Sequence, residues 1–526
     1  MKHPRSPEQL LVFTGSFIFF LCTLATNFSG PHDSIGYLNG IVTGKNLAHP
    51  HHLYYHYSAH YWLVITQAIF PGIKDYYLVE AFTAFCGAGT VTIIFAFFRH
   101  RFGFSWPVAL LNTSVAVFSY GMWFYSVNIE VYASSMFLVL WALYLLTRPG
   151  FGKRELWQVA LLHALAILYG ELHILLVVVV LYKLWSVRKQ LPLRYSLPVY
   201  AGIGILLVGG SYFYLGWYVE GYNSAAAWVA WMKGYTTHAS YWHPLSLKTP
   251  VSVTTGLAHA FVGGHYLLRI PGVSDTIDKS LSAHSLADEA YLAQHINGTT
   301  AIILTLLTIF LVICMGWLFI GFIRKYRTLR QQQGRVIQPL LVCGLVYSAF
   351  FCVWEPEILE FWILQTVLFW LLVLGALPVT GFPFRLRPVA GTLALSICLL
   401  LVNYFGSIHW LRDLGHDLYY VEVQPLDKEA TDKDLIIQNK EWVFKDFLVY
   451  FTKAQVLNTP AADSLRAPAE LAISQTLSHG GRVFIYPGAR TGNYETRYLD
   501  SLLREYADWK TVFRAEEPVI LQLKHP

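Results

Sequence analysis

Long apolar stretches separated by short polar connections run through most of the chain. A helix needs about 20 apolar residues to cross a bilayer, and about eleven stretches approach this length. Only helices and closed barrels satisfy backbone polar groups inside lipid, so the pattern predicts a mainly α, polytopic membrane helix bundle. The expected crossings lie near residues 9–28, 79–98, 106–125, 131–147, 156–170, 172–187, 197–217, 300–323, 338–354, 358–379 and 389–408.

The pattern changes after residue 408, where charged residues become frequent and short apolar runs alternate with amphipathic ones. Residues 434–438 read as a buried strand, 441–452 as a helix, 454–457 as a strand, 470–478 as a helix and 482–486 as a strand. Alternation of this kind predicts a small α/β domain. We therefore expect a transmembrane domain over 1–408, with large outward loops at 29–78 and 218–298, and a soluble α/β domain over 409–526.

Composition supports a membrane protein. The 526 residues are 55% hydrophobic and 13% charged, whereas soluble domains contain about a quarter charged residues. The six cysteines all lie in apolar stretches, which indicates buried side chains rather than a disulfide framework or a zinc site. The first apolar segment lacks a small-residue cleavage site, so we expect it to be retained as a helix.

The distribution of Lys and Arg predicts the orientation, because cytoplasmic loops are enriched in both. Connections without basic residues, near 128–130, 170–173 and 355–357, alternate with basic ones. This alternation puts the N-terminus in the cytoplasm and the C-terminal domain outside. The basic connections hold Lys2 and Arg5; Arg99 and Arg101; Arg148, Lys153 and Arg154; Lys183, Arg188, Lys189 and Arg194; Arg324, Lys325, Arg327 and Arg330; and Arg385 and Arg387.

Acidic residues gather at the expected outward ends of the helices rather than at mid-membrane depth. A proton-coupled transporter usually has ionisable groups near the middle of the membrane. The distribution therefore favours a site that opens at the level of the lipid headgroups. These acids are Asp33, Glu130, Glu171, Glu220, Glu355, Glu357 and Glu360.

Asp33 follows the first apolar segment and is the best candidate for a general base. A carboxylate can accept the proton of a hydroxyl that attacks a sugar. The alternative is structural, because Asp is a preferred N-cap and Asp33 precedes the amphipathic stretch 34–46.

The histidines of the first outward loop have helical spacing. His49, His52, His56 and His60 would share one face of a helix, and imidazoles can bind metal, move protons or donate to phosphate. We expect His49 and His52 to line a polar cavity. A metal site stays open as an alternative, although the run lacks a carboxylate at close spacing.

A lipid phosphate requires a cation near the outer interface, and few outward basic residues exist: Lys45, Lys74, Lys233, Lys248, Arg269 and Lys279. Arg269 is the preferred candidate because its guanidinium binds phosphate oxygens in a fork, and His265 lies one helical turn before it. The alternative is an Arg that anchors an amphipathic helix to headgroups.

Three outward turns carry further candidates. Each acid there could simply favour a helix N-terminus or be solvated, but three such turns together predict a shared polar cavity. The turns contain Glu130 and Tyr132; Glu171 and His173; and Glu355 with Glu357.

These motifs resemble those of the GT-C membrane glycosyltransferases, in particular the branch related to the protein O-mannosyltransferases. Members have an Asp-Ser/Gly start in the first outward loop, a His-Pro-Pro-Gly-Tyr-like element, a Glu-Val-Tyr at an outward helix start and a Gly-x-x-His element. The similar segments here are Asp33-Ser34, His49-Pro50-His51-His52-Leu53-Tyr54, Glu130-Val131-Tyr132 and Gly170-Glu171-Leu172-His173.

The resemblance covers the first third of the chain by motif and the remainder by topology. Two positions depart from the family pattern: Gly36 stands where a Glu is frequent, and His51 stands where a second Pro is frequent. The first departure puts a paired-carboxylate or metal role at position 36 in question.

The resemblance implies an inverting glycosyltransferase in which Asp33 acts on an acceptor hydroxyl of a protein, glycan or lipid. A polyprenyl-phosphate sugar would enter from the outer leaflet, with its phosphate near Arg269. We expect a bacterial inner membrane, no nucleic-acid partner, and a divalent metal as an open question. A flippase of lipid-linked sugars and a non-catalytic scaffold are the alternatives. The substrate-binding candidates are His49, His52, Tyr54, Glu130, Tyr132, Glu171, His173, His265, Arg269 and Glu355.

Overall fold

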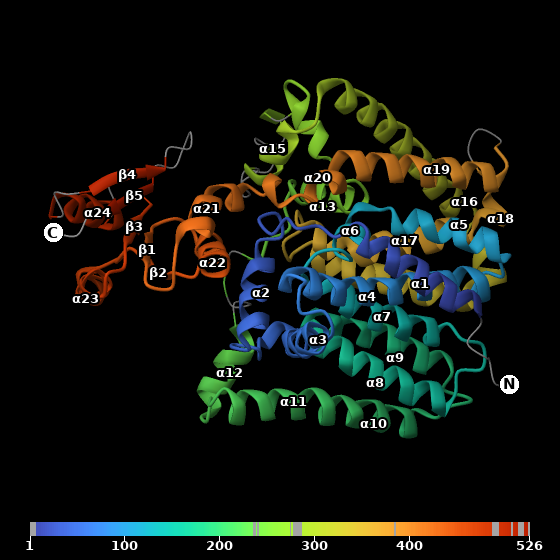
Figure 1. The fold of residues 1–526 in the computed structure, drawn as a ribbon. Coiled ribbons are helices and arrows are strands. Elements are labelled where there is room, and N and C mark those ends of the chain that lie inside the picture. The colour runs from blue at the N-terminus through green and yellow to red at the C-terminus, as the bar shows by residue number, and fades with distance from the viewer. Residues whose placement is uncertain are drawn as a thin grey trace. The chain divides into compact units, whose positions relative to one another are not determined.

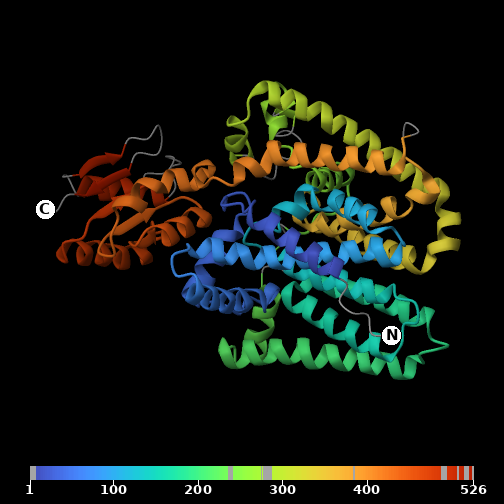
Figure 2. The same ribbon diagram turned by 45° about the vertical axis from the view of Figure 1, so that its right-hand side comes forward.

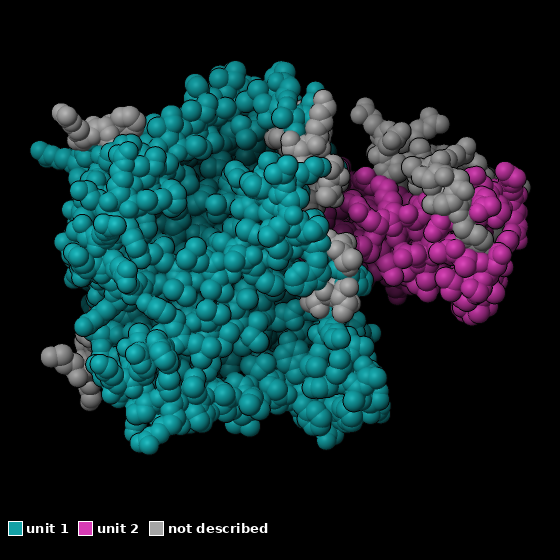
Figure 3. Space-filling model, turned by 180° about the vertical axis from the view of Figure 1, so that it is seen from behind, with its two compact units in different colours: residues 1–26, 40–412 teal, residues 27–39, 413–526 magenta. Residues whose placement is uncertain are grey.

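The computed structural model contains two compact units. Unit 1 comprises residues 1–26 and 40–412, and unit 2 comprises residues 27–39 and 413–526 (Figure 3). The structure describes residues 7–234, 238, 241–273, 275–276, 287–382, 386–486, 494–505, 509–513 and 520–523.

Unit 1 is built almost entirely of helices (Figure 1). The expected helical membrane fold is confirmed. Its helices are α1 (Pro7–Leu21), α3 (Tyr55–Ile69), α4 (Asp75–Ala96), α5 (Trp106–Val117), α6 (Tyr120–Phe124), α7 (Tyr132–Leu146), α8 (Lys153–Tyr169), α9 (Leu176–Ser186), α10 (Leu193–Gly204), α11 (Gly210–Phe213), α12 (Ala225–Lys233), α13 (Thr249–Phe261), α15 (Ala287–Gln294), α16 (Gly298–Phe351), α17 (Ile363–Gly375), α18 (Leu377–Thr380), α19 (Pro388–Asn403) and α20 (His409–Leu411).

The apolar helices differ in length. Among the described residues, four helical segments are long and apolar enough to cross a membrane: Asp75–Arg101, Leu193–Val219, Gly298–Phe351 and Pro388–Leu411. Four shorter apolar helices cover Pro7–Leu21, Trp106–Val117, Tyr132–Leu146 and Leu359–Gly375. The expected crossing at 9–28 thus ends early, because α1 stops at Leu21 and a turn and irregular chain follow.

The expected crossings at 300–323 and 338–354 are joined by helix rather than by a loop. α16 has 54 residues, and its backbone leaves helical values only at Gln333 (φ −131°, ψ 20°). A straight helix of that length would extend about 80 Å, well beyond a hydrocarbon core of about 30 Å. The break at Gln333 therefore divides two helices, which run in different directions in Figure 2.

Small residues of α4 allow α1 and α7 to pack closely against it in unit 1. A Cβ atom at Gly87 of α4 would lie 2.5 Å from the Ser126 hydroxyl, and one at Gly89 would lie 2.8 Å from the Phe137 ring. Such close approach is typical of helix contacts in membranes. Larger residues at either position would force the helices apart.

Unit 2 contains a five-stranded sheet in the order β2-β1-β3-β5-β4. β1 is parallel to β2 and β3, while β5 is antiparallel to β3 and β4. The predicted α/β fold of the tail is confirmed. The elements are α21 (Leu418–Glu429), β1 (Leu435–Gln438), α22 (Trp442–Phe451), β2 (Gln455–Asn458), α23 (Arg466–Ser478), β3 (Val483–Ile485), α24 (Tyr494–Glu505), β4 (Trp509–Phe513) and β5 (Ile520–Leu523).

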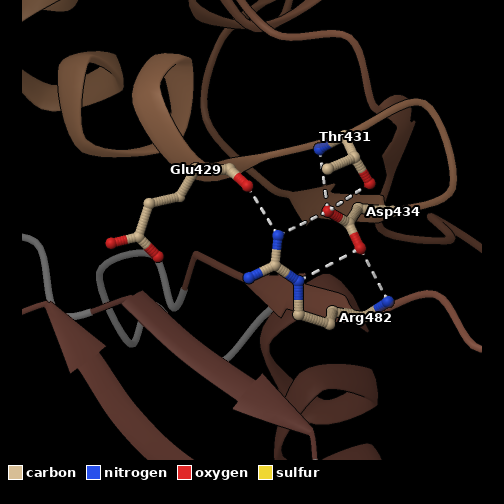
Figure 4. A network of polar contacts seen from close by, with 4 residues as sticks. All are labelled: Glu429, Thr431, Asp434 and Arg482. Atoms are coloured by element: carbon tan, nitrogen blue, oxygen red, sulfur yellow. Dashed lines mark hydrogen bonds and ion pairs between the residues drawn. The ribbon is translucent and has the colours of Figure 1, made fainter.

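A charged pair fixes the starts of β1 and β3 (Figure 4). The Arg482 guanidinium donates to both oxygens of Asp434, at 3.3 Å and 2.8 Å, and the Thr431 N–H donates to Asp434 Oδ2 at 2.8 Å. Burial raises the pKa of Asp434, but these hydrogen bonds outweigh it and the net pKa is lowered. The paired carboxylate thus holds the two parallel strands in register.

A second carboxylate attaches residues 27–39 to the C-terminal part of unit 2. Asp417 is fully buried and accepts four backbone hydrogen bonds. Its Oδ2 accepts from Phe28 and Ser29 at 2.7 Å and 2.9 Å, and its Oδ1 accepts from Tyr419 and Tyr420 at 3.0 Å each. We call this arrangement the Asp417 clamp. It caps α21 and fixes the chain that leads to Asp33.

Candidate functional site

Asp33 is the first residue of α2 (Asp33–Thr43). The Tyr37 hydroxyl, one turn later, donates to Asp33 Oδ2 at 3.2 Å. Burial raises the pKa of Asp33, and the Tyr37 hydrogen bond and His32 lower it. The residue also keeps an exposed surface, so water can reach its carboxylate. An accessible carboxylate is suited to accept a proton.

The backbone before Asp33 is strained. His32 has φ 52°, a left-handed value that non-glycine residues rarely adopt. Such strain persists only where the surrounding structure enforces it. The Asp417 clamp, which holds Phe28 and Ser29, provides that constraint on this short segment.

In unit 1, the histidines of η1 (Pro50–His52) and α3 form a compact cluster. The rings of His49 and His52 stack with centroids 5.2 Å apart, and His51 and His56 lie 5.4 Å and 6.0 Å from His49. Burial lowers the pKa of His49 to about 4 and that of His56 to about 3. The imidazoles of His49 and His56 can therefore donate or accept hydrogen bonds as neutral groups at neutral pH.

Glu171 joins this histidine cluster through His51. Glu171 begins η3 (Glu171–Leu175), and its Oε1 lies 2.5 Å from His51 Nδ1. The Tyr212 hydroxyl donates to the carbonyl of Pro50 at 2.5 Å and holds the same turn. The structure therefore brings Glu171 together with the histidines through His51, the residue that departs from the family motif.

His173 and Tyr54 make contacts that hold the helices together. His173 Nδ1 lies 3.1 Å from the Tyr347 hydroxyl, and its carbonyl lies 2.8 Å from His163 Nε2. The Tyr54 hydroxyl lies 2.7 Å from the Ser211 hydroxyl. The side chains of His173 and Tyr54 thus bind other residues of unit 1, which indicates that they position the turns in which they lie.

Glu360 accepts hydrogen bonds from two tyrosines. The Tyr132 hydroxyl donates to Oε1 at 2.5 Å, and the Tyr125 hydroxyl donates to Oε2 at 3.1 Å. Glu130 is 2% exposed and interacts electrostatically with Tyr125. The Glu-Val-Tyr motif is therefore built around Glu360, which the sequence analysis identified only as one of several outward acids.

The Glu360→Ala variant should lose about 2 to 4 kcal/mol of free energy of unfolding, because two tyrosine hydroxyls lose a charged acceptor. Chemical denaturation in detergent micelles measures the change. The matched control is Glu8→Ala, whose partly exposed ion pair with Arg99 spans 3.1 Å and is worth about 1 kcal/mol or less. Equal losses in both variants would contradict a structural role for the two hydrogen bonds.

His265 and Arg269 belong to η8 (His265–Arg269) and differ in environment. His265 is buried, its Nδ1 lies 2.7 Å from the Ser407 hydroxyl, and burial lowers its pKa to about 3. Arg269 is exposed and forms no ion pair with any other described residue. Arg269 can therefore bind an anion, whereas His265 is a neutral packing residue.

Glu355 occupies a strained turn. Its φ is 41°, it precedes Pro356, and its N–H donates to the carbonyl of Tyr241 at 3.3 Å. A left-handed Glu directly before proline is costly, so the turn is fixed by its surroundings. Within the described part of the chain, no three or more His, Cys, Asp or Glu side chains form a group suited to hold a metal ion.

Two further groups escaped the sequence analysis. His51 stood out in the sequence only as a departure from the motif. Its position next to His49 and His52 could have identified it as part of the histidine cluster. Glu80 of α4 is fully buried, and neither carboxyl oxygen has a hydrogen-bond partner among the described residues. The sequence feature that could have identified Glu80 is a single charge at the start of an otherwise apolar crossing.

No protein-family model matches the sequence, and no curated protein matches it either. Solved structures do match. The crystal structure of ArnT from Cupriavidus metallidurans bound to undecaprenyl phosphate aligns with a TM-score of 0.57 and 10% identity over 99% of both chains. The apo structure of ArnT aligns with the same score and identity over 98% of both chains. The chain thus has the fold of ArnT along nearly its whole length, in agreement with the expected polytopic helix bundle and C-terminal α/β domain.

Proposed function

We propose that this integral membrane protein is a glycosyltransferase that moves a sugar from a polyprenyl-phosphate donor to an acceptor hydroxyl. The supporting observation is the match in fold to ArnT over 99% of both chains, because that ArnT structure contains undecaprenyl phosphate. The motif that begins with Asp33 supports the same reaction.

Asp33 acts as the general base. It accepts the proton of the acceptor hydroxyl while the acceptor oxygen forms a bond to the anomeric carbon of the sugar. The bond from that carbon to the phosphate oxygen breaks, and the polyprenyl phosphate leaves with the electron pair. Attack opposite the leaving group inverts the configuration of the sugar.

Arg269 is the cation proposed for the donor phosphate, because it is exposed and its planar guanidinium matches phosphate oxygens. The neutral histidines His49 and His52, with Glu171, offer hydrogen bonds to sugar hydroxyls. Tyr54, His173, His265 and Glu355 fix the turns in which each lies, and Glu130 and Tyr132 belong to the Glu360 region. We place the N-terminus in the cytoplasm and unit 2 in the periplasm of a bacterium, on the basis of the distribution of Lys and Arg.

The full-length protein in nanodiscs, supplied with undecaprenyl phosphate carrying a radiolabelled hexose and with a membrane extract as acceptor, tests the proposal. We expect label to leave the lipid and appear on the acceptor together with free undecaprenyl phosphate. Mass spectrometry of glycans and glycoproteins from cells with and without the gene then identifies the acceptor and the sugar. Movement of labelled lipid between leaflets of proteoliposomes, without any new glycosidic bond, would instead identify a flippase.

A further inference from the structure

Within unit 2, α22 of the C-terminal domain faces α2. The Asn39 side-chain amide donates to the backbone carbonyl of Asp446 at 3.0 Å. A Cβ atom at Gly36 would lie 3.1 Å from Asp446 Oδ2 and 3.8 Å from the Trp442 ring. The Asp446 carboxylate therefore occupies the space that the missing side chain of Gly36 leaves open.

Asp33 and Gly36 are three residues apart in α2 and so lie on one face of that helix. A carboxylate over Gly36 consequently lies on the Asp33 face. Burial raises the pKa of Asp446, Lys445 lowers it, and the negative charge of Asp33 raises it again. The electrostatic contact between the two carboxylates agrees with the helix geometry.

We infer that Asp446 is a positioning residue for Asp33: it places a second carboxylate beside the base, from the opposite end of the chain, on the helix face that Gly36 leaves open. This inference rests on the proposed function of Asp33. Gly36 stands where a Glu is frequent in the resembling family, and α22 supplies a carboxylate at that position instead.

Two carboxylates on one face do not ionise independently. They lose their protons in two coupled steps that belong to the pair. The negative charge of each carboxylate opposes ionisation of the other, so Asp446 retains its proton to higher pH than an isolated Asp. A carboxyl group in this state can orient the Asp33 side chain without cancelling its basicity.

Transfer from undecaprenyl phosphate carrying a radiolabelled hexose, measured against pH, tests the inference. In Asp446→Asn, kcat/KM should fall by about 10- to 100-fold, as expected for a misplaced catalytic group. The acidic limb of the plot of kcat/KM against pH should also move to lower pH in this variant, because a neighbouring like charge no longer opposes ionisation of Asp33. Glu441→Gln, which removes an exposed charge next to the same helix, should match the wild type in both respects.

A variant that moves the carboxylate from α22 to α2 distinguishes a chemical role of Asp446 from a role in folding. In the double variant Gly36→Asp/Asp446→Ala, the new side chain enters the space vacated by Asp446. We expect it to restore the wild-type acidic limb that Asp446→Ala alone shifts. A purely structural Asp446 would not be rescued in this way. Asp446→Asn keeps the side-chain size and the backbone acceptor for Asn39, so it remains informative if Asp446→Ala does not fold.

An Asp446→Asn enzyme with wild-type kcat/KM and an unchanged acidic limb would overturn the inference while leaving Asp33 as the base. A fully active Asp33→Asn enzyme would instead remove the proposed function of Asp33. The two failures are therefore distinguishable in one set of variants.

Discussion

The Asp33→Asn variant should transfer sugar about 10²- to 10⁴-fold more slowly than the wild type, the usual contribution of a general base. Asn has nearly the same shape and still accepts the Tyr37 hydrogen bond through its carbonyl oxygen. It cannot accept a proton from the acceptor hydroxyl. The measurement is kcat with undecaprenyl phosphate carrying a radiolabelled hexose.

The matched control for this variant is Asp432→Asn, which removes an exposed carboxylate from the same unit and should leave kcat unchanged. Binding of undecaprenyl phosphate, followed by thermal shift, should be equal in all three proteins. Wild-type kcat in Asp33→Asn would eliminate Asp33 as the base. An Asp33→Asn variant that no longer binds undecaprenyl phosphate but keeps its kcat would assign Asp33 to recognition of the donor.

The Asp417→Ala variant should lose on the order of 3 kcal/mol or more of unit 2 stability, because four buried backbone N–H groups lose a charged acceptor. It should also lose transfer activity, since Phe28 and Ser29 are no longer held and Asp33 is no longer positioned. Limited proteolysis of residues 27–39 measures the loss of stability, and a transfer assay on the same preparation measures the loss of activity.

Asp413→Ala is the matched control for the Asp417 clamp. Asp413 also caps a turn, through a 2.9 Å hydrogen bond from the Gly415 N–H, but it is exposed and makes no bond to residues 27–39 among the described contacts. This variant should cost about 1 kcal/mol or less. An Asp417→Ala enzyme that resists proteolysis and transfers sugar normally would show that the clamp does not position Asp33.

Hydropathy predicted the helical membrane fold and the α/β tail because both depend on local periodicity. It failed at residues 324–337, where charged side chains were interpreted as a loop. Arg, Lys, Gln and Leu are strong helix formers, so a charged segment can mark the membrane boundary while the helix continues to Gln333.

Local spacing likewise predicted part of the candidate site. Three- and four-residue intervals predicted one shared face for His49, His52, His56 and His60. The rings of the first three lie together, whereas His60 Nδ1 lies 2.6 Å from the carbonyl of Ile41. Asp417 and Asp446 could not be found in this way. Each acts on residues 27–39 from the far end of the chain, and single-sequence patterns carry no information about such distant pairs.

The Asp417 clamp has a consequence for biosynthesis. The stretch that follows α1 completes its fold only when Asp417, nearly 390 residues later in the chain, has been synthesised and binds it. A chain that stops before Asp417 would hold the helices of unit 1 without the four hydrogen bonds that fix Phe28 and Ser29 and cap α21.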